Sequence, residues 1–239
     1  MKHARERIIL ALDTHEKDYA LEIVDKFDGL VDTFKVGLEL FTAAGPSMVE
    51  EIHRRGKSVF LDLKFHDIPN TMARAARQAA RMGVFMFNVH ASSGFKAMER
   101  VASDVVELCL KKNIQRPRML GVTVLTSASQ EELKELGIQH SLKTQVKHLA
   151  ALAQRAGLDG VVASAHEIEM IRGHCGEKFL IVTPGIRPSW SPPDDQKRTM
   201  TPRQAIHLGA DFIVLGRAVL AQPDPVKSLE LITVEIMTA

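Results

Sequence analysis

The sequence lacks the features that would place a 239-residue chain in a membrane or outside the cell. It holds two cysteines, Cys109 and Cys175, and no C-x-x-C pair, which argues against a disulfide scaffold and against a zinc site. No apolar run approaches membrane-spanning length, and the apolar run near the start of the chain ends at Asp13, too early for a signal peptide. We therefore expect a cytoplasmic protein.

The sequence also has no large excess of positive or of negative residues. The 31 Lys and Arg residues nearly balance the 29 Asp and Glu residues, for a formal charge of +2. This balance gives no reason to expect a nucleic acid or an anionic membrane as a partner. A small anionic ligand would instead have to be held by a few local cations.

Apolar strands follow helical segments at once, and each helix ends on a glycine such as Gly56, Gly83, Gly157 or Gly209. The strands are apolar at successive positions, which is typical of parallel strands buried on both faces. Eight are predicted, at about 7–13, 34–38, 58–64, 84–90, 119–126, 160–164, 179–183 and 212–216.

Helices are predicted between these strands, at 16–28, 46–55, 71–82, 95–112, 130–136, 144–156 and 202–208. Eight strand–helix repeats in one chain favour a closed (β/α)₈ TIM barrel over an open doubly wound sheet. No linker composition divides residues 1–239, so one domain is expected. The long irregular segment 184–201 is of a length that is usually functional or disordered.

Charged residues gather where the predicted strands end, which is where barrel enzymes place their catalytic groups. The third strand ends with Asp62, Lys64 and then Asp67, and Asp62 and Lys64 share one face because they are two residues apart. Lys35 on the neighbouring strand extends this set into an alternating array of lysine and aspartate. A structural salt-bridge network is the alternative, although buried ion pairs stabilise proteins only weakly.

The seventh and eighth strands end in a pattern that suits a phosphate group. The eighth runs into Gly216 and Arg217 before a helix, and the seventh runs into Pro184 and Arg187. Barrels often bind phosphate at this place, with backbone N–H groups at a helix N-terminus and arginine as donors. One Gly-Arg pair alone would be a turn with a solvated arginine, but two such strand ends favour a phosphate site.

The segment F-L-D62-L-K64-F-H-D67-I-P-N-T71 resembles the D-x-K-x-x-D signature of the orotidine 5′-phosphate decarboxylase family. The resemblance extends to the motifs A-L-D13, F-K35-V-G, T-V-L-T126-S127, T-P-G-I-R187, D-D-Q196 and V-L-G216-R217. It implies a homodimeric enzyme that converts orotidine 5′-phosphate into uridine 5′-phosphate and carbon dioxide in pyrimidine biosynthesis, with no cofactor and no metal.

The resemblance also implies a role for each matching residue. Lys64 would protonate C6 of the pyrimidine, beside Asp62, and Lys35 would keep this array in register. The other members of the site are divided among the ribose (Asp13, Lys35), the base (Thr126, Ser127), the phosphate (Arg187, Gln196, Gly216, Arg217), further substrate contact (Pro184) and the neighbouring subunit's site (Asp67, Thr71). The segment 184–201 would close over the phosphate.

Two alternatives remain. The 3-keto-L-gulonate 6-phosphate decarboxylases and hexulose-phosphate synthases share the barrel and the D-x-K-x-x-D string, but they use magnesium held partly by an acidic residue on the second strand. Here that position is Lys35, which would repel a divalent cation, and Glu39 lies too far along the chain. A non-catalytic nucleotide-binding barrel is the second alternative, and the intact charged array argues against it.

Overall fold

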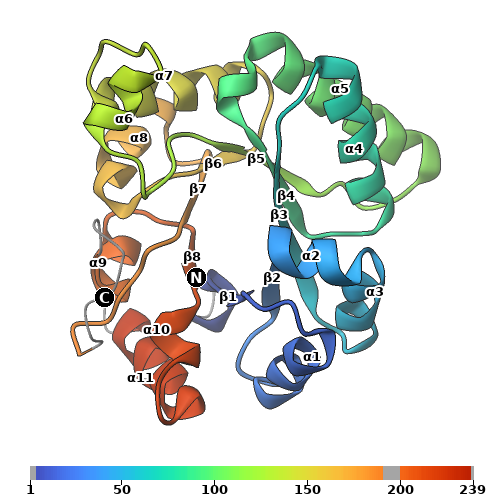
Figure 1. The fold of residues 1–239 in the computed structure, drawn as a ribbon, viewed down its shortest axis with the longest axis vertical. Helices are drawn as coiled ribbons and strands as arrows, with labels where there is room; N and C mark the ends of the chain where they lie inside the picture. Colours follow the sequence, from blue (N-terminus) through green and yellow to red (C-terminus); the bar gives the residue numbers. More distant parts are fainter. Residues whose placement is uncertain (1–3, 191–199, 238–239) are drawn as a thin grey trace.

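Eight parallel strands close into a barrel in the order in which they occur along the chain (Figure 1). The structure, a computed structural model, describes residues 4–190 and 200–237. The strands are β1 (Ile8–Leu12), β2 (Thr33–Gly37), β3 (Ser58–Phe65), β4 (Met86–His90), β5 (Arg118–Val122), β6 (Gly160–Val162), β7 (Leu180–Thr183) and β8 (Phe212–Leu215). Pairing of β8 with β1 closes the ring and confirms the predicted (β/α)₈ TIM barrel.

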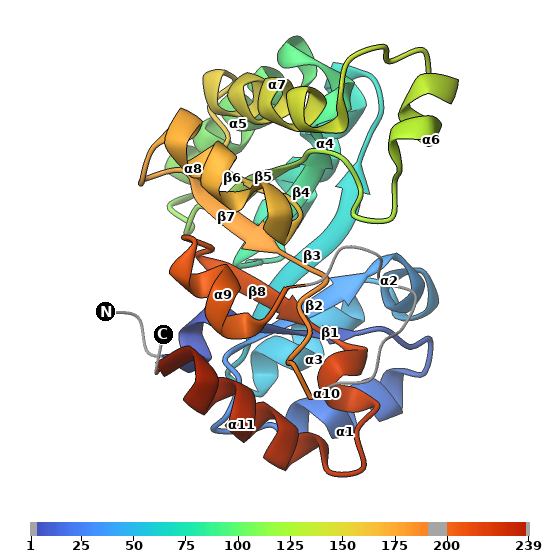
Figure 2. The same ribbon diagram turned by 90° about the vertical axis from the view of Figure 1, so that its left-hand side faces the viewer.

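Helices surround the barrel, as two views at right angles show (Figure 1 and Figure 2). They are α1 (Lys17–Lys26), α2 (Leu38–Ala44), α3 (Ser47–Arg54), α4 (Pro69–Arg81), α5 (Phe95–Lys112), α6 (Gln130–Glu135), α7 (Leu142–Arg155), α8 (Ile168–Cys175), α9 (Pro202–His207), α10 (Arg217–Leu220) and α11 (Pro225–Met237), with 3-10 turns η1 (Ala4–Arg7), η2 (Ala91–Ser93) and η3 (Ala165–Glu167). Within the described ranges, none of these helices combines the length and the apolar character that crossing a bilayer requires.

The helix predicted after Gly216 is present as α10, but a further helix, α11, was not predicted. α10 and α11 follow β8, and α11 packs against η1, α9 and α10. α11 buries Leu229 and Ile232, but Leu231 and Val234 on its outer side are apolar and about half exposed. A surface helix is normally predicted from the alternation of an apolar and a polar face, and this alternation is weak here because both sides of α11 carry apolar residues.

The strand wall separates two apolar cores. The outer core lies between the strands and the helices, and the inner core fills the barrel with side chains that include Ile9, Phe60, Met86, Leu120 and Phe212. Successive residues of a strand point to opposite faces, so Phe34 and Val36 join the outer core while Lys35 between them points inward. The apolar inner core therefore forms the floor on which the charged residues lie.

Candidate active site

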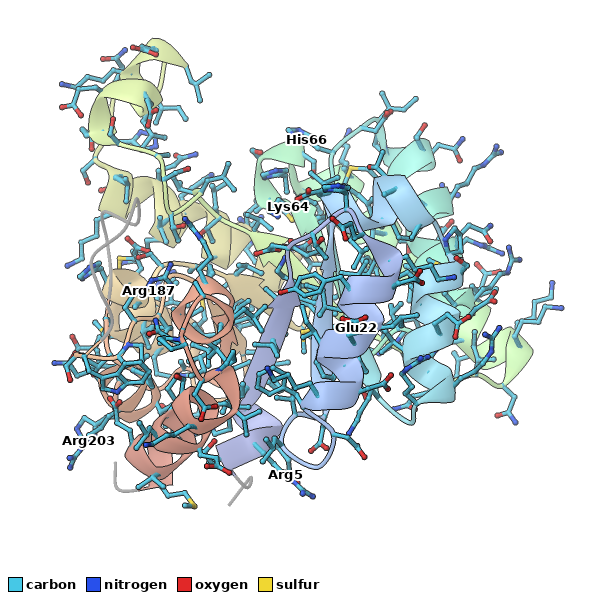
Figure 3. The ribbon with its side chains drawn as sticks, turned by 60° about the horizontal axis from the view of Figure 1, so that its bottom comes forward. Arg5, Glu22, Lys64, His66, Arg187 and Arg203 are labelled. Carbon is cyan, nitrogen blue, oxygen red and sulfur yellow. The ribbon has the colours of Figure 1, made fainter. Side chains whose placement is uncertain are left out.

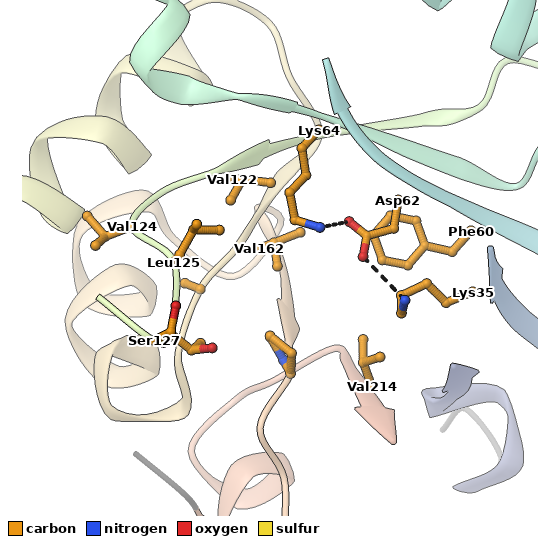
Figure 4. A pocket seen from close by; sticks show the side chains of 13 residues that line it. Lys35, Phe60, Asp62, Lys64, Val122, Val124, Leu125, Ser127, Val162 and Val214 are labelled. Atoms are coloured by element: carbon orange, nitrogen blue, oxygen red, sulfur yellow. Dashed lines mark hydrogen bonds and ion pairs between the residues drawn. The ribbon is translucent and has the colours of Figure 1, made fainter. Parts of the chain in front are cut away.

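Four charged side chains form a chain of ion pairs at the mouth of the barrel, where the strands have their C-terminal ends. Lys35 Nζ lies 2.8 Å from Asp13 Oδ1 and 3.5 Å from Asp62 Oδ2, and Lys64 Nζ lies 2.7 Å from Asp62 Oδ1. The two lysines approach the two oxygens of Asp62 from different sides (Figure 4). Lys64 lies at the opposite end of the barrel from Arg5, which precedes β1 (Figure 3).

Lys35 is the buried member of this charged array, with 9% of its surface exposed. Burial acts to lower the pKa of Lys35, but the carboxylates of Asp62 and Asp13 together outweigh burial and leave that pKa raised above its ordinary value. Lys35 is therefore a permanent cation at neutral pH. Its charge holds the two carboxylates beside each other, since unpaired anions would be costly to keep in this site.

A bulge in β3 shapes the array. Leu61 pairs with Phe87 and Phe65 pairs with Val89, so the residues 62–64 of β3 lie opposite Asn88 alone on β4. Lys64 has a φ of 51°, in the left-handed region that costs a non-glycine residue about 1–3 kcal/mol. The bulge thus lifts Lys64 out of the regular ladder and brings its ammonium group against Asp62.

Asn88 is the residue of this site to which the sequence analysis gave no role. Its side chain has no exposed surface; it donates from Nδ2 to Asp62 Oδ1 at 2.7 Å and accepts at Oδ1 from the backbone N–H of Lys64 at 2.8 Å. The available signal was its position: Asn88 is two residues after Met86 of the inner core, so it shares the inward face of β4. A buried amide on that face needs hydrogen-bonding partners.

A cavity of about 240 Å³ lies beside the array and is charged on one side and largely apolar on the other (Figure 4). Lys35, Asp62 and Lys64 form the charged side. The other lining residues are Phe60, Val122, Val124, Leu125, Thr126, Ser127, Val162, Ala163, Pro184 and Val214. The predicted substrate-binding residues Thr126, Ser127 and Pro184 thus line the same cavity as the two lysines. Such a site suits a flat, partly apolar ring with polar groups at its edge.

Two glycines allow close approach next to Asp13. A Cβ atom at Gly37 would lie 3.0 Å from Lys35 Nζ and 3.8 Å from Asp13 Oδ1, and a Cβ atom at Gly216 would lie 3.4 Å from Asp13 Oδ2. Gly216 is the N-cap of α10, and Arg217 is the first residue of that helix. The strand-eight end that the sequence predicted as a phosphate site is therefore adjacent to the Asp13 end of the charged array.

The structure does not bring all predicted residues into this cavity. Asp67 and Thr71 are exposed, and Asp67 accepts a hydrogen bond at 2.6 Å from the backbone N–H of Ile68. Arg187 is half-buried beyond β7 and donates to the carbonyl of Ile186 at 3.0 Å. Gln196 and most of the predicted closing segment lie outside the described residues.

Two histidines lie near the array. The rings of His66 and His90 have centroids 5.4 Å apart. Burial, followed by the charges of His66 and Lys64, lowers the pKa of His90 below its ordinary value, so His90 is neutral at pH 7. Across residues 4–190 and 200–237, no three His, Cys, Asp or Glu side chains are grouped in a way that could hold a metal ion.

Together, the fold and the site define a class of protein: (β/α)₈ barrels with a cluster of charged side chains at the C-terminal ends of the strands, where barrel enzymes have their active sites. Comparison with known sequences gives the family. A profile of the Orotidine 5′-phosphate decarboxylase / HUMPS family matches residues 6–232, and the chain belongs to that family.

Individual relatives agree with this assignment. The chain is 49% identical over 236 residues to orotidine 5′-phosphate decarboxylase of Geobacter metallireducens, covering 98% of this chain and 97% of the relative. It is 51% identical over 227 residues to orotidine 5′-phosphate decarboxylase of Syntrophomonas wolfei, covering 94% and 95%. The crystal structure of orotidine 5′-phosphate decarboxylase from Lactobacillus acidophilus matches with a TM-score of 0.85 at 33% identity, covering 97% of this chain and 99% of that chain.

Replacement of Gly37 by alanine tests how closely the array is packed. Gly37 has φ −92° and ψ −175°, which alanine adopts without strain, but the added methyl would press on Lys35 Nζ at 3.0 Å. We expect the shifted ammonium to loosen its contacts with both aspartates and to lower kcat roughly tenfold to a hundredfold, or about 1.4–2.8 kcal/mol. Steady-state kinetics gives the change in kcat, and thermal unfolding shows whether the variant is folded.

Gly173→Ala is the matched control, because a Cβ atom at Gly173 in α8 meets nothing within 4 Å. We expect its kcat to equal that of the unmodified protein. A Gly37→Ala protein with unchanged kcat would show that the position of Lys35 Nζ is not tightly constrained.

Proposed function

We propose that this protein decarboxylates orotidine 5′-phosphate to uridine 5′-phosphate and carbon dioxide, as a carbon–carbon lyase of pyrimidine biosynthesis. The observation that carries the proposal is the Lys64 ammonium, held 2.7 Å from Asp62 at the edge of a largely apolar cavity. Full-length identity of about half to relatives named for this activity supports it.

The reaction requires this kind of group. When the bond from C6 to the carboxylate breaks, its electron pair stays at C6 in the plane of the ring, where the π system cannot absorb it. An ammonium beside C6 stabilises that carbanion electrostatically and then transfers a proton to it, which completes the product. Lys64 would supply both effects, and its contact with Asp62 would hold the ammonium in position beside C6.

The array has the charges that this role needs. Asp13, Lys35, Asp62 and Lys64 sum to zero within one chain, and each lysine contacts a carboxylate. The Lys64 ammonium would thus be paired with Asp62 at the place where the proton is needed. Repulsion between Asp62 and the carboxylate of the substrate would add to the driving force for carbon dioxide loss.

The pyrimidine, the ribose and the phosphate of the substrate would bind to separate groups of residues. The pyrimidine would lie between Lys64 and the side formed by Thr126, Ser127 and Pro184, all of which line the cavity. The ribose hydroxyls would bind Asp13 and Lys35. The phosphate would lie beyond them, at Gly216 with Arg217, Arg187 and Gln196. Phosphate binding is remote from the bond that breaks, so its binding energy can serve to orient the ring.

The active form would be a homodimer in which Asp67 and Thr71 complete the site of the second copy. Residues 66–71 form a continuous exposed segment that leads from β3 into α4. Ile68 in this segment is 65% exposed, and a large apolar side chain next to the catalytic array is the kind of group that a subunit interface buries. Residues 1–239 would act as one domain in this dimer.

The geometry favours this reaction over that of the magnesium-dependent members of the barrel group. A divalent cation bound by Asp62 would meet the ammonium of Lys35, which lies 3.5 Å from Asp62 Oδ2. Repulsion between two cations at such a distance in a partly buried site is strong. Lys35 thus occupies the place where those enzymes require a carboxylate.

Absorbance measurements on the purified protein test the proposal. On mixing with orotidine 5′-phosphate in the presence of a chelator, we expect loss of the substrate's ultraviolet absorbance and formation of uridine 5′-phosphate, at a rate that the chelator does not change. No turnover would refute the proposal and leave the non-catalytic barrel. Turnover that the chelator abolishes would instead support a metal-dependent enzyme.

A further inference from the structure

Asn88 is an uncharged residue that bonds to the charged array but does not line the cavity. It is fully buried at the bulge of β3 and is not among the residues that line the cavity, so it does not reach a bound ligand. Yet its side chain bonds both to the carboxylate of Asp62 and to the backbone of Lys64. Any effect of Asn88 on chemistry must therefore act through these two residues.

The two hydrogen bonds fix the orientation of the amide. The backbone N–H of Lys64 can only donate, so it requires Oδ1 of Asn88, and the carboxylate of Asp62 accepts, so it requires Nδ2. Turning the amide over would place donor against donor and acceptor against acceptor. Neither a carboxylate nor an aliphatic side chain of this size supplies one donor and one acceptor in these directions.

The bulge explains why such a group is needed. Residues 62–64 lie opposite Asn88 alone, so the backbone N–H of Lys64 has no regular ladder partner on β4 and uses the side chain instead. The same residue carries the left-handed φ of 51°, which is unfavourable for lysine unless the surroundings impose it. The Asn88 amide is the partner that the structure provides for this conformation.

We infer that Asn88 is a positioning residue for the reaction: a single buried amide fixes both the carboxylate of Asp62 and the backbone of Lys64, and so sets where the Lys64 ammonium stands. This inference rests on the proposed decarboxylation. The relevant precision is high, because misplacement of a reacting group by about 1 Å can cost on the order of a hundredfold in rate.

Asn88→Ala removes both hydrogen bonds. We expect kcat for orotidine 5′-phosphate to fall roughly tenfold to a hundredfold, while the dissociation constant of uridine 5′-phosphate changes by less than about threefold because Asn88 does not line the cavity. Leu108→Ala is the matched control, since Leu108 is a fully buried residue of the outer core, in α5, and does not line the cavity. It should lower the melting temperature at least as much and leave kcat close to that of the unmodified protein.

Asn88→Asp keeps the shape of the side chain and gives a signature that general destabilisation would not. The groups around it are Asp62 and Lys64 on β3, Lys35 on β2 and His90 on β4, and its partner on β5 is the apolar Leu120. An ionised carboxylate there would repel Asp62, whereas a protonated one could donate to Asp62 and accept from Lys64. Burial and the charge of Asp62 favour the protonated form, so kcat of this variant relative to the unmodified protein should rise as the pH falls from 8 to 5.

Three outcomes are distinguishable. If the unmodified protein does not turn over orotidine 5′-phosphate, the proposed function fails, and the inference fails with it. If that protein is active but Asn88→Ala keeps kcat within about threefold, or Leu108→Ala loses as much activity, Asn88 has only a structural role. A pH profile of Asn88→Asp parallel to that of the unmodified protein would likewise overturn the inference.

Discussion

Lys64→Ala should abolish catalysis while the protein still folds and binds nucleotide. The variant removes the ammonium that lies 2.7 Å from Asp62 Oδ1 at the cavity, and with it both the charge that would stabilise a C6 carbanion and the proton that would convert it to product. We expect kcat to fall by at least about a thousandfold, or roughly 4 kcal/mol of transition-state stabilisation. Uridine 5′-phosphate should still bind, because its ribose and phosphate are proposed to contact other residues.

Steady-state kinetics and calorimetric titration with uridine 5′-phosphate give the two measurements. Lys57→Ala is the matched control, since Lys57 pairs with Asp28 at 2.6 Å next to the other end of β3, far from the cavity. Loss of that pair should leave kcat unchanged, because neither Lys57 nor Asp28 lines the cavity. Activity of Lys64→Ala within about tenfold of the unmodified protein, a barrier change of roughly 1.4 kcal/mol, would show that Lys64 is not the central acid.

Two inactive variants should restore each other's activity if the proposed dimer is correct. We expect Lys64→Ala and Asp67→Ala to be nearly inactive alone. In a mixed dimer, one site lacks both groups and the other has Lys64 from one copy and Asp67 from the other. Random assortment makes half of the dimers mixed, each with one intact site, so the mixture should regain about one quarter of the unmodified activity.

Refolding or co-expression of the two variants, followed by an activity assay, tests this expectation. A mixture of Lys64→Ala with Asp62→Ala is the control and should stay inactive, because Asp62 and Lys64 belong to the same chain's array and no assortment brings both into one site. Absence of recovery in the first mixture would place Asp67 in its own chain's site. Full activity of Asp67→Ala alone would remove Asp67 from the catalytic machinery.

The residues that could be recognised from the sequence are those whose placement follows from strand order and parity. Lys35 and Asp62 point inward because they occupy inward positions of strands whose intervening residues, Phe34 and Leu61, belong to the outer core. Gly216 and Arg217 could be placed at a helix start because apolar strand eight ends directly before them. The alternation of apolar and charged residues within a strand is enough to place Lys35 and Asp62, and the end of an apolar run is enough to place Gly216 and Arg217.

The residues that escaped recognition depend on contacts between distant parts of the chain. Asn88 gains its importance only because β3 carries extra residues opposite it, and a bulge has no signal in the apolar pattern of either strand. Gly37 matters because Lys35 Nζ stands 3.0 Å from where its Cβ would be. Helix α11 was missed because apolar residues on its exposed side mask its period.

By itself, the sequence determined that eight buried parallel strands alternate with helices, that Lys35, Asp62 and Lys64 belong to one end of the barrel, and that the chain resembles a decarboxylase family. Local patterns suffice for this because side-chain direction and strand order are properties of neighbouring residues. The tertiary structure shows in addition that Asn88 bonds to both Asp62 and the left-handed Lys64, and that Asp67 is exposed and is not among the residues that line the cavity. Those facts depend on the register between two strands and on the path of the chain after a bulge, which no local pattern encodes.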